Sequence, residues 1–110
     1  MIKSSIVWSD GEILSGIQEA VLASKPNIEK RIYKDNLISE LSLRGYSVKT
    51  NTWVADRGDG SRGLIDILAD NKGHITAICI VGSNPTVKAH IKLNNSDADT
   101  VLMVGRCFRG

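Results

Sequence analysis

Two apolar segments in the second half of the chain constrain its fold more than any other feature of the sequence. They run from Leu64 to Leu68 and from Ile75 to Val81, and aliphatic residues dominate both. Short apolar runs of this length, bounded by turn residues, are typical of strands buried inside a sheet. The residues between them, Asp-Asn-Lys-Gly at 70–73, have the composition of a hairpin turn. The sequence therefore predicts a buried β-hairpin.

Another buried strand is expected near the end of the chain. Residues 99–104 end in Thr-Val-Leu-Met-Val, and the segment from Pro85 to Leu93 can form a short helix before it, with Asn84 as a candidate cap. A helix that connects two strands of one sheet generally places them parallel, by a right-handed crossover. We therefore expect the last two strands to pair in parallel.

The first half of the chain is predicted to be largely helical. Ser9 and Glu12 have the spacing of a capping box, and apolar residues recur at helical spacing after them, which predicts an amphipathic helix over 10–23. A second helix is expected to begin near Pro26 and to end at Gly45. Its apolar residues project to two sides, as in a helix packed between two layers, here the sheet and the first helix.

Alternating apolar and polar residues over 46–54 indicate a half-exposed strand ahead of the hairpin. The expected fold class is thus α/β, with a mixed four-stranded sheet flanked by helices and the element order α-α-β-β-β-α-β. A length of 110 residues is close to the common size of one domain, so residues 1–110 are interpreted as a single domain.

Composition excludes several classes of protein. Hydrophobic residues make up 42% and charged residues 24% of the chain, which is typical of a globular protein and not of a disordered one. No apolar run approaches the roughly 18 residues of a membrane span, and the N-terminus lacks a signal-peptide pattern. We therefore expect a cytoplasmic protein with no membrane partner. The formal net charge of +2 indicates nucleic-acid binding only if basic residues cluster on one face.

Cysteine and histidine residues form no metal-binding pattern in the sequence. Cys79 lies within the apolar run 77–81, where a small buried thiol is the expected role. Together with Cys107 it is too little for a disulfide framework or a zinc site. His74 and His90 are isolated and lack metal-ligand spacing.

The order of elements, together with the residues of the hairpin, resembles the PD-(D/E)XK superfamily, which includes restriction enzymes, junction resolvases and repair nucleases. The resemblance covers roughly residues 27–104, and residues 1–25 would form an added N-terminal helix. In that family the second strand carries an aspartate after a glycine and apolar residues, and here residues 63–66 read Gly-Leu-Ile-Asp. The third strand typically reads apolar-apolar-Glu-apolar-Lys-Gly, and here residues 77–82 read Ala-Ile-Cys-Ile-Val-Gly.

This resemblance implies a degenerate catalytic centre. In the family two carboxylates hold Mg²⁺ through oxygen ligands, the metal activates the attacking water and the lysine helps to position that water. Asp66 keeps its acid, but Cys79 and Val81 occupy the positions of the second acid and of the lysine. Because residues 79 and 81 point to the same face of a strand, a protonated thiol and an isopropyl group would face the metal position. We therefore expect no cofactor.

If ligands have moved, the resemblance indicates Glu40 and Lys88 as the replacements. Relatives place a glutamate on the helix before the sheet, and some carry the lysine on the helix after it. In that case Asp66 would bind Mg²⁺ together with Glu40, and Lys88 would take the role of the lysine. Simpler interpretations stay open for all three: Asp66 bonded to a neighbouring backbone N–H, and Glu40 and Lys88 solvated on helix surfaces.

Basic residues in two places are candidates for contacts with nucleic-acid phosphates. Arg57 and Arg62 frame a glycine-rich segment, although aspartates in the same segment partly cancel their charge. Lys88 and Lys92 lie one helical turn apart and could form a phosphate-facing or simply solvated surface.

Three hypotheses for function follow. The leading one is a catalytically degenerate nuclease-like domain that binds nucleic acid or a protein partner in a DNA-processing or mobile-element context. The first alternative is an active Mg²⁺-dependent endonuclease with Glu40, Asp66 and Lys88 as relocated catalytic groups. The second is a structural or oligomerisation module. A homodimer is compatible with each, because many relatives of the resembled fold pair up.

Overall fold

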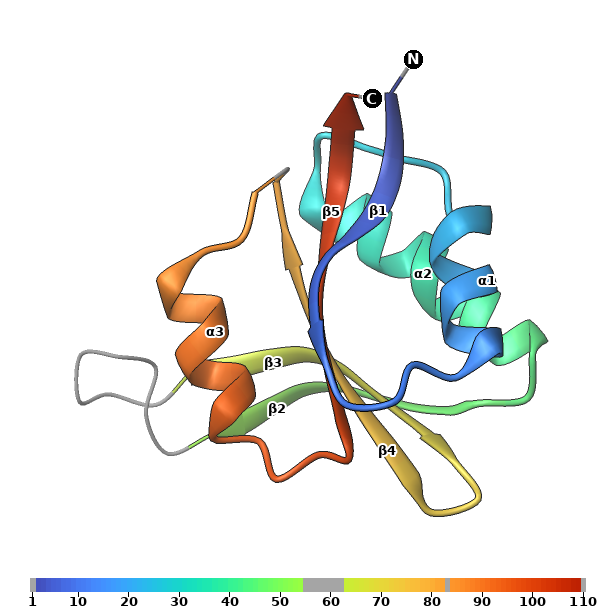
Figure 1. Cartoon of the computed structure of the whole chain (residues 1–110). Coiled ribbons are helices and arrows are strands. Elements are labelled where there is room, and N and C mark those ends of the chain that lie inside the picture. Colours follow the sequence, from blue (N-terminus) through green and yellow to red (C-terminus); the bar gives the residue numbers. More distant parts are fainter. Residues whose placement is uncertain (1, 55–62, 83, 110) are drawn as a thin grey trace.

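The computed structural model describes residues 2–54, 63–82 and 84–109, and it has an α/β fold in the order β-α-α-β-β-β-α-β (Figure 1). The strands are β1 (Ile2–Asp10), β2 (Ser47–Val54), β3 (Gly63–Asn71), β4 (His74–Val81) and β5 (Thr100–Arg109). The helices are α1 (Ser15–Ala23), α2 (Lys30–Leu43) and α3 (Val87–Asn94).

The five strands form one mixed sheet in the order β1-β5-β4-β3-β2. β4 and β5 are parallel, with Cys79 beside Met103, and the other neighbours are antiparallel. The parallel pairing predicted for the last two strands is therefore confirmed. β1 pairs with β5 along its length, so that Ile2 lies opposite Arg109 and both ends of the described chain lie side by side at one end of the sheet (Figure 1).

The N-terminal strand was not predicted, and the expectation of a four-stranded sheet is wrong by this one strand. The structure places Ser9 inside β1, whereas Leu14 precedes the first residue of α1 and makes no side-chain cap bond. The expected capping box is therefore absent from this end of α1. Two register shifts in the β1–β5 pairing explain the missed strand, because a bulge breaks the period of two by which strands are recognised in a sequence.

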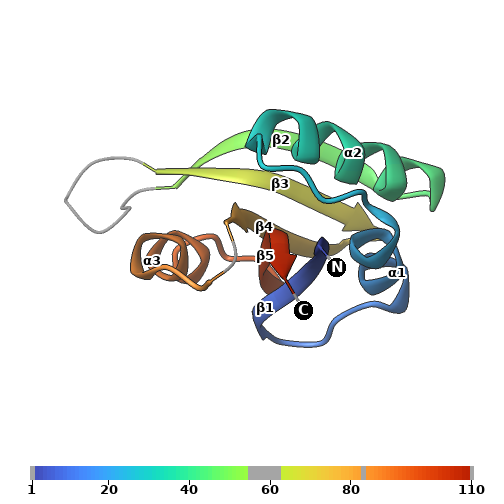
Figure 2. The ribbon, with the colours of Figure 1, turned by 90° about the horizontal axis from the view of Figure 1, so that it is seen from above.

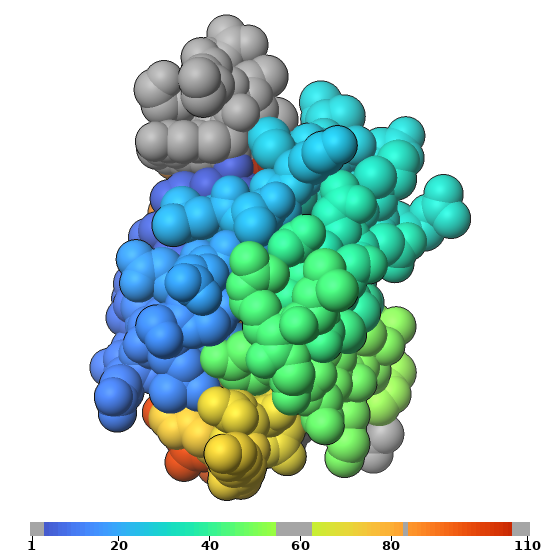
Figure 3. Space-filling model, turned by 90° about the vertical axis from the view of Figure 1, so that its right-hand side faces the viewer, coloured from blue at the N-terminus to red at the C-terminus, as the bar shows by residue number. Residues whose placement is uncertain are grey.

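Helices cover both faces of the sheet (Figures 1 and 2). α1 packs on β1, and α2 packs beside it on β2, β3 and β4. α3 packs on the opposite face against β3, β4 and β5. Figure 3 looks onto the first layer, where α1 (blue) and α2 (cyan to green) lie side by side.

This arrangement contradicts the prediction that α2 is packed between the sheet and α1. Tyr33, Leu37 and Leu41 are fully buried, but on its other side Ile32 is 38% exposed and Leu43 is 79% exposed. α2 also begins at Lys30, four residues later than the expected start at Pro26. Its end is as expected, since Gly45 has φ +87°, a conformation that glycine adopts at little cost.

Each face of the sheet has its own hydrophobic core. β4 contributes to both, because its successive side chains point to opposite faces. On the α1–α2 side the core includes Ile67, Ala69, Ile78 and Ile80 of the sheet. On the α3 side it includes Ile65, Ala77, Cys79 and Val81 of the sheet.

Side-chain hydrogen bonds fix both the turn of the β3–β4 hairpin and the start of α3. The predicted turn at 70–73 is confirmed: the backbone N–H of Gly73 donates to Oδ1 of Asp70 at 2.9 Å, and Lys72 and Gly73 both have positive φ. α3 begins at Val87, and its N-cap is Thr86, whose Oγ1 accepts a bond from the N–H of Ala89 at 3.2 Å. The expected cap at Asn84 is therefore wrong.

Candidate functional site

The hairpin strands β3 and β4 are paired only near their turn. Their paired residues run from Asn71 with His74 to Ile67 with Ile78, although β3 begins at Gly63 and β4 continues to Val81. The outer halves of the two strands therefore diverge. In an antiparallel pair, such a gap leaves backbone groups that need other partners.

The side chain of Asp66 fills part of this gap. Its Oδ2 accepts a hydrogen bond from the backbone N–H of Ile80 at 2.8 Å, and its Oδ1 lies 2.8 Å from Nζ of Lys30. Asp66 is 6% exposed, so its charge would be costly without partners. Both carboxylate oxygens are thus used within the protein, one by a backbone N–H and one by an ammonium group.

The regular pleat of the sheet is interrupted at the same place. Ile65 packs into the core under α3, whereas Ile67, two residues further on, packs into the core under α1 and α2. Residues two apart on a regular strand share a face, so the strand changes orientation at Asp66. On the neighbouring strand, Asn51 has φ +53° and lies between the pairs Thr50 with Ile67 and Thr52 with Ile65.

A cavity of about 430 Å³ opens beside Asp66. It is lined by residues from two helices and two strands: Lys30, Arg31 and Lys34 of α2, Asn51 of β2, Leu64 and Asp66 of β3, and Lys92 of α3. Four basic side chains thus face one carboxylate, and that carboxylate is already paired with Lys30. Within the described ranges Arg31, Lys34 and Lys92 take part in no ion pair, and the Nζ of Lys34 donates to Oδ1 of Asn51 at 2.6 Å.

Cys79 and Val81 face the core under α3, on the same side of β4 as predicted from their spacing. Burial raises the pKa of the Cys79 thiol from its ordinary value of 9.0 to about 11, and the nearby charge of Asp66 acts in the same direction. The thiol is therefore protonated at neutral pH. Val81 is 7% exposed and offers only an alkyl group.

These residues do not fit a Mg²⁺ site. Hard cations need several oxygen ligands, and the one carboxylate here has both oxygens engaged, beside a protonated thiol and a valine. Among the residues that the structure describes, no three His, Cys, Asp or Glu side chains are grouped to hold a metal ion. The ammonium group of Lys30 instead occupies the position of a cation bound to Asp66.

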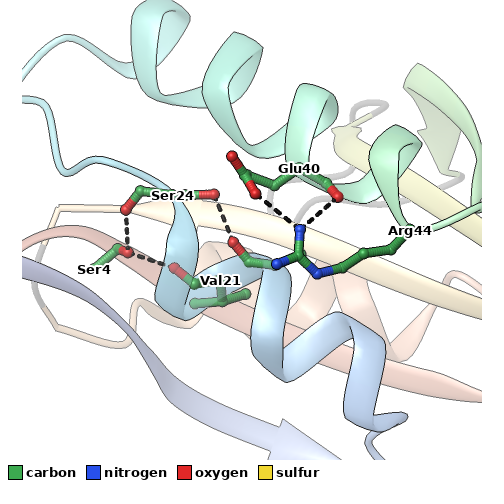
Figure 4. Close-up of polar contacts among 6 residues, drawn as sticks. Ser4, Val21, Ser24, Glu40 and Arg44 are labelled. Carbon is green, nitrogen blue, oxygen red and sulfur yellow. Dashed lines mark hydrogen bonds and ion pairs between the residues drawn. The ribbon is translucent and has the colours of Figure 1, made fainter.

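The relocated ligands predicted from the sequence do not reach this cavity. Glu40 forms an ion pair with Arg44, the C-cap residue of α2, with 2.8 Å between Oε1 and Nη1 (Figure 4). It lies ten residues beyond Lys30, which is about 15 Å along a helix. Lys88 is exposed on α3 and does not line the cavity. The structure therefore separates Glu40 and Lys88 from Asp66.

Figure 4 also shows how the end of α1 is fixed to β1, away from the cavity. Oγ of Ser4 donates to the carbonyl oxygens of Val21 at 2.7 Å and of Ser24 at 3.0 Å. Oγ of Ser24 donates to the carbonyl of Ala20 at 2.7 Å. These side-chain bonds tie β1 to the last turn of α1, where the backbone N–H of Ser24 also donates to the carbonyls of Ala20 and Val21.

Of the predicted nucleic-acid contacts, Lys92 lies at the cavity, and Arg57 and Arg62 lie outside the described residues. The sequence reasoning missed Lys30, Arg31 and Lys34. The spacing of Lys30 and Lys34 did indicate a shared basic face, because residues four apart on a helix lie on the same side of it. Asn51 gave no sign in the sequence beyond the general tolerance of asparagine for positive φ.

The fold and the cavity together define an α/β protein with a mixed five-stranded sheet and a basic cavity between α2 and α3. Comparison with models of protein families, with curated proteins and with solved structures finds no match to this chain. No helix in the described part of the chain is long and apolar enough to cross a membrane.

Proposed function

We propose that this chain is a PD-(D/E)XK-like domain that has lost metal-dependent catalysis and binds nucleic acid through the basic cavity. One observation carries the proposal: Lys30 and the N–H of Ile80 hold both oxygens of Asp66, the residue that corresponds to the family's metal-binding aspartate. A metal ion bound there would have to displace the lysine and would find no second carboxylate.

Kinship with the restriction-endonuclease-like fold is supported by the connections of the sheet. A helix precedes the antiparallel meander β2-β3-β4, and α3 then connects β4 to a parallel β5. Asp66 and Cys79 lie close to each other where β3 and β4 diverge, since Ile80, the residue after Cys79, donates its backbone N–H to Oδ2 of Asp66 at 2.8 Å. On this proposal β1 and α1 are additions to the family core.

Nucleic acid is the proposed ligand because of the sign and grouping of the charges. The whole chain carries only +2, yet four basic side chains and one carboxylate line this single cavity. Lysine and arginine side chains that face a common space are the usual binders of phosphate oxygens. Such binding weakens as salt is added, because counterions are released from the nucleic acid.

Binding can be tested with fluorescently labelled single-stranded and duplex DNA, measured by anisotropy at several salt concentrations. We expect binding that decreases with salt, and Lys92→Gln should reduce the magnitude of the single-strand salt slope by about 0.7. Lys88→Gln is the matched control, because Lys88 lies one turn away on α3 and is exposed outside the cavity. Equal effects of the two substitutions, or no binding at low salt, would contradict the proposal.

The loss of catalysis needs a separate experiment. Plasmid and single-stranded DNA are incubated with the protein in Mg²⁺ and in Mn²⁺, with Asp66→Asn as the comparison. We expect no cleavage by either protein above background. Cleavage by the wild type that disappears in Asp66→Asn would restore the hypothesis of an active nuclease.

A further inference from the structure

The charge in the cavity exceeds what one internal phosphodiester would neutralise. Lys30 is compensated by Asp66, which leaves Arg31, Lys34 and Lys92 as three further cations around the same space. A phosphodiester carries one negative charge, whereas a phosphate monoester carries about −1.5 to −2 at pH 7. The charge balance therefore favours a monoester.

The origin of these cations also favours a compact anion. Arg31 and Lys34 come from α2 on one face of the sheet, and Lys92 comes from α3 on the other. They converge where β3 and β4 diverge instead of forming a row along one helix. A row of charges would suit a continuous backbone, but convergence from two sides suits a single group with several oxygens.

The remaining lining residues would accommodate the group next to that phosphate. Leu64 gives the cavity an apolar wall, and Asn51 is held in place by the bond from Lys34 to its Oδ1. A cavity of about 430 Å³ lies in the size range of small-ligand sites, roughly 300–1,000 Å³. It has room for one nucleotide unit.

We infer that the cavity binds the terminal phosphate monoester of a nucleic-acid strand. This inference rests on the proposed function and narrows it to strand ends. Arg31, Lys34 and Lys92 contact the phosphate oxygens, and Leu64 contacts the terminal sugar or base. The Lys30–Asp66 pair forms the base of the site, where the lysine screens the incoming phosphate from the buried carboxylate.

The test uses one single-stranded DNA oligonucleotide with an internal fluorophore, prepared with a 5′-phosphate, with a 3′-phosphate or with neither. We expect one of the phosphorylated forms to bind at least about tenfold more tightly than the unphosphorylated form, which corresponds to about 1.4 kcal/mol. Lys34→Gln and Lys92→Gln should each remove most of that advantage. Lys92→Arg, which keeps the charge, should retain it, as should the control Lys88→Gln.

The outcomes separate this inference from the proposed function. Equal binding of the three oligonucleotides, still weakened by Lys92→Gln, overturns the inference and leaves the proposed function standing. No binding of any form contradicts both. An advantage for a phosphorylated end that persists in Lys34→Gln and Lys92→Gln also overturns the inference, because the phosphate would then be bound elsewhere. Circular dichroism of each variant confirms that these comparisons are made on folded protein.

Discussion

The ammonium group of Lys30 lies 2.8 Å from Oδ1 of Asp66, and this ion pair ties the first turn of α2 to β3 where β3 diverges from β4. A single contact thus connects a helix, a break in the sheet and the wall of the basic cavity. The same contact uses the carboxylate oxygen that a metal ion would need.

Replacement of Lys30 by glutamine should destabilise the protein by about 1 kcal/mol. The substitution leaves a buried carboxylate without its counter-charge, but Lys30 is 46% exposed, so water compensates part of the loss. Denaturant unfolding measures the change. Glu40→Gln is the control, because it removes an i,i+4 ion pair on the same helix that is expected to contribute only about 0.3–0.5 kcal/mol. Equal losses in the two variants would show that the Lys30–Asp66 pair is an ordinary surface contact.

The buried thiol of Cys79 should make the protein less stable at alkaline pH. Its pKa is raised from 9.0 to about 11 in the folded state, so above pH 9 the unfolded chain releases a proton that the folded chain retains. Stability from this group is complete below pH 9 and is lost as the pH rises towards 11, by at most about 3 kcal/mol. The free energy of unfolding, measured from pH 8 to 11, should therefore fall less steeply in Cys79→Ala.

Part of the alkaline decline should remain in that variant. Burial also raises the pKa of Tyr33, whose ordinary value is 10.0, so this phenol contributes a loss of the same sign at higher pH. Identical slopes for the wild type and Cys79→Ala between pH 9 and 11 would contradict the assignment to Cys79.

If the proposed kinship with the PD-(D/E)XK family holds, introducing that family's acid and lysine at residues 79 and 81 should create metal binding only when Lys30 is also replaced. Cys79→Glu with Val81→Lys supplies the second carboxylate and the lysine, but Lys30 still competes for Asp66. We expect calorimetry to detect Mn²⁺ binding in the triple variant with Lys30→Gln, and an increase in its melting temperature with Mn²⁺ concentration.

Adding Asp66→Asn to the triple variant serves as its control and should abolish the heat of binding. If the folded triple variant binds no Mn²⁺, then residues 66 and 79 do not converge on a common ion position. Binding by the double variant with Lys30 intact would instead show that the lysine moves away readily.

Asn51 should tolerate glycine but not a β-branched residue. Its φ of +53° is accessible to asparagine and glycine and is strained for valine. Asn51→Val should therefore cost about 1–3 kcal/mol of unfolding free energy, while Asn51→Gly should change it by much less. Thr50→Val is the control: it measures how much a valine at the neighbouring exposed position of β2 changes the free energy of unfolding. A cost for Asn51→Val no larger than that of Thr50→Val would argue against the positive φ.

The central hairpin and the parallel last pair could be predicted because their signals are local. The apolar runs of β3 and β4, the Asp-Asn-Lys-Gly turn and the helix before β5 each occupy a few consecutive residues. β1 escaped prediction because a bulge between Ile6 and Trp8 puts the consecutive residues Val7 and Trp8 against the same core, which breaks the alternation of faces along a regular strand. The packing of α2 was misjudged because Leu43 and Ile32 are apolar but exposed, and no local rule separates them from core residues.

The candidate site was predictable only in part. The bond between Asp66 and a neighbouring backbone N–H was one of the interpretations kept open, since a carboxylate in an apolar strand needs a partner. The pairing with Lys30 could not be foreseen, because it depends on where α2 begins relative to the sheet. The convergence of Lys34 and Lys92 likewise depends on two helices that pack on opposite faces.

The antiparallel pairing of β1 with β5 brings Ile2 opposite Arg109. A short peptide linker could therefore join these two positions, and new chain ends could be opened in the turn at Lys72 and Gly73. In such a circular permutant each strand would keep its neighbours in the sheet. β4 would become the first strand of the chain and β3 the last, so their pairing would join the two chain ends.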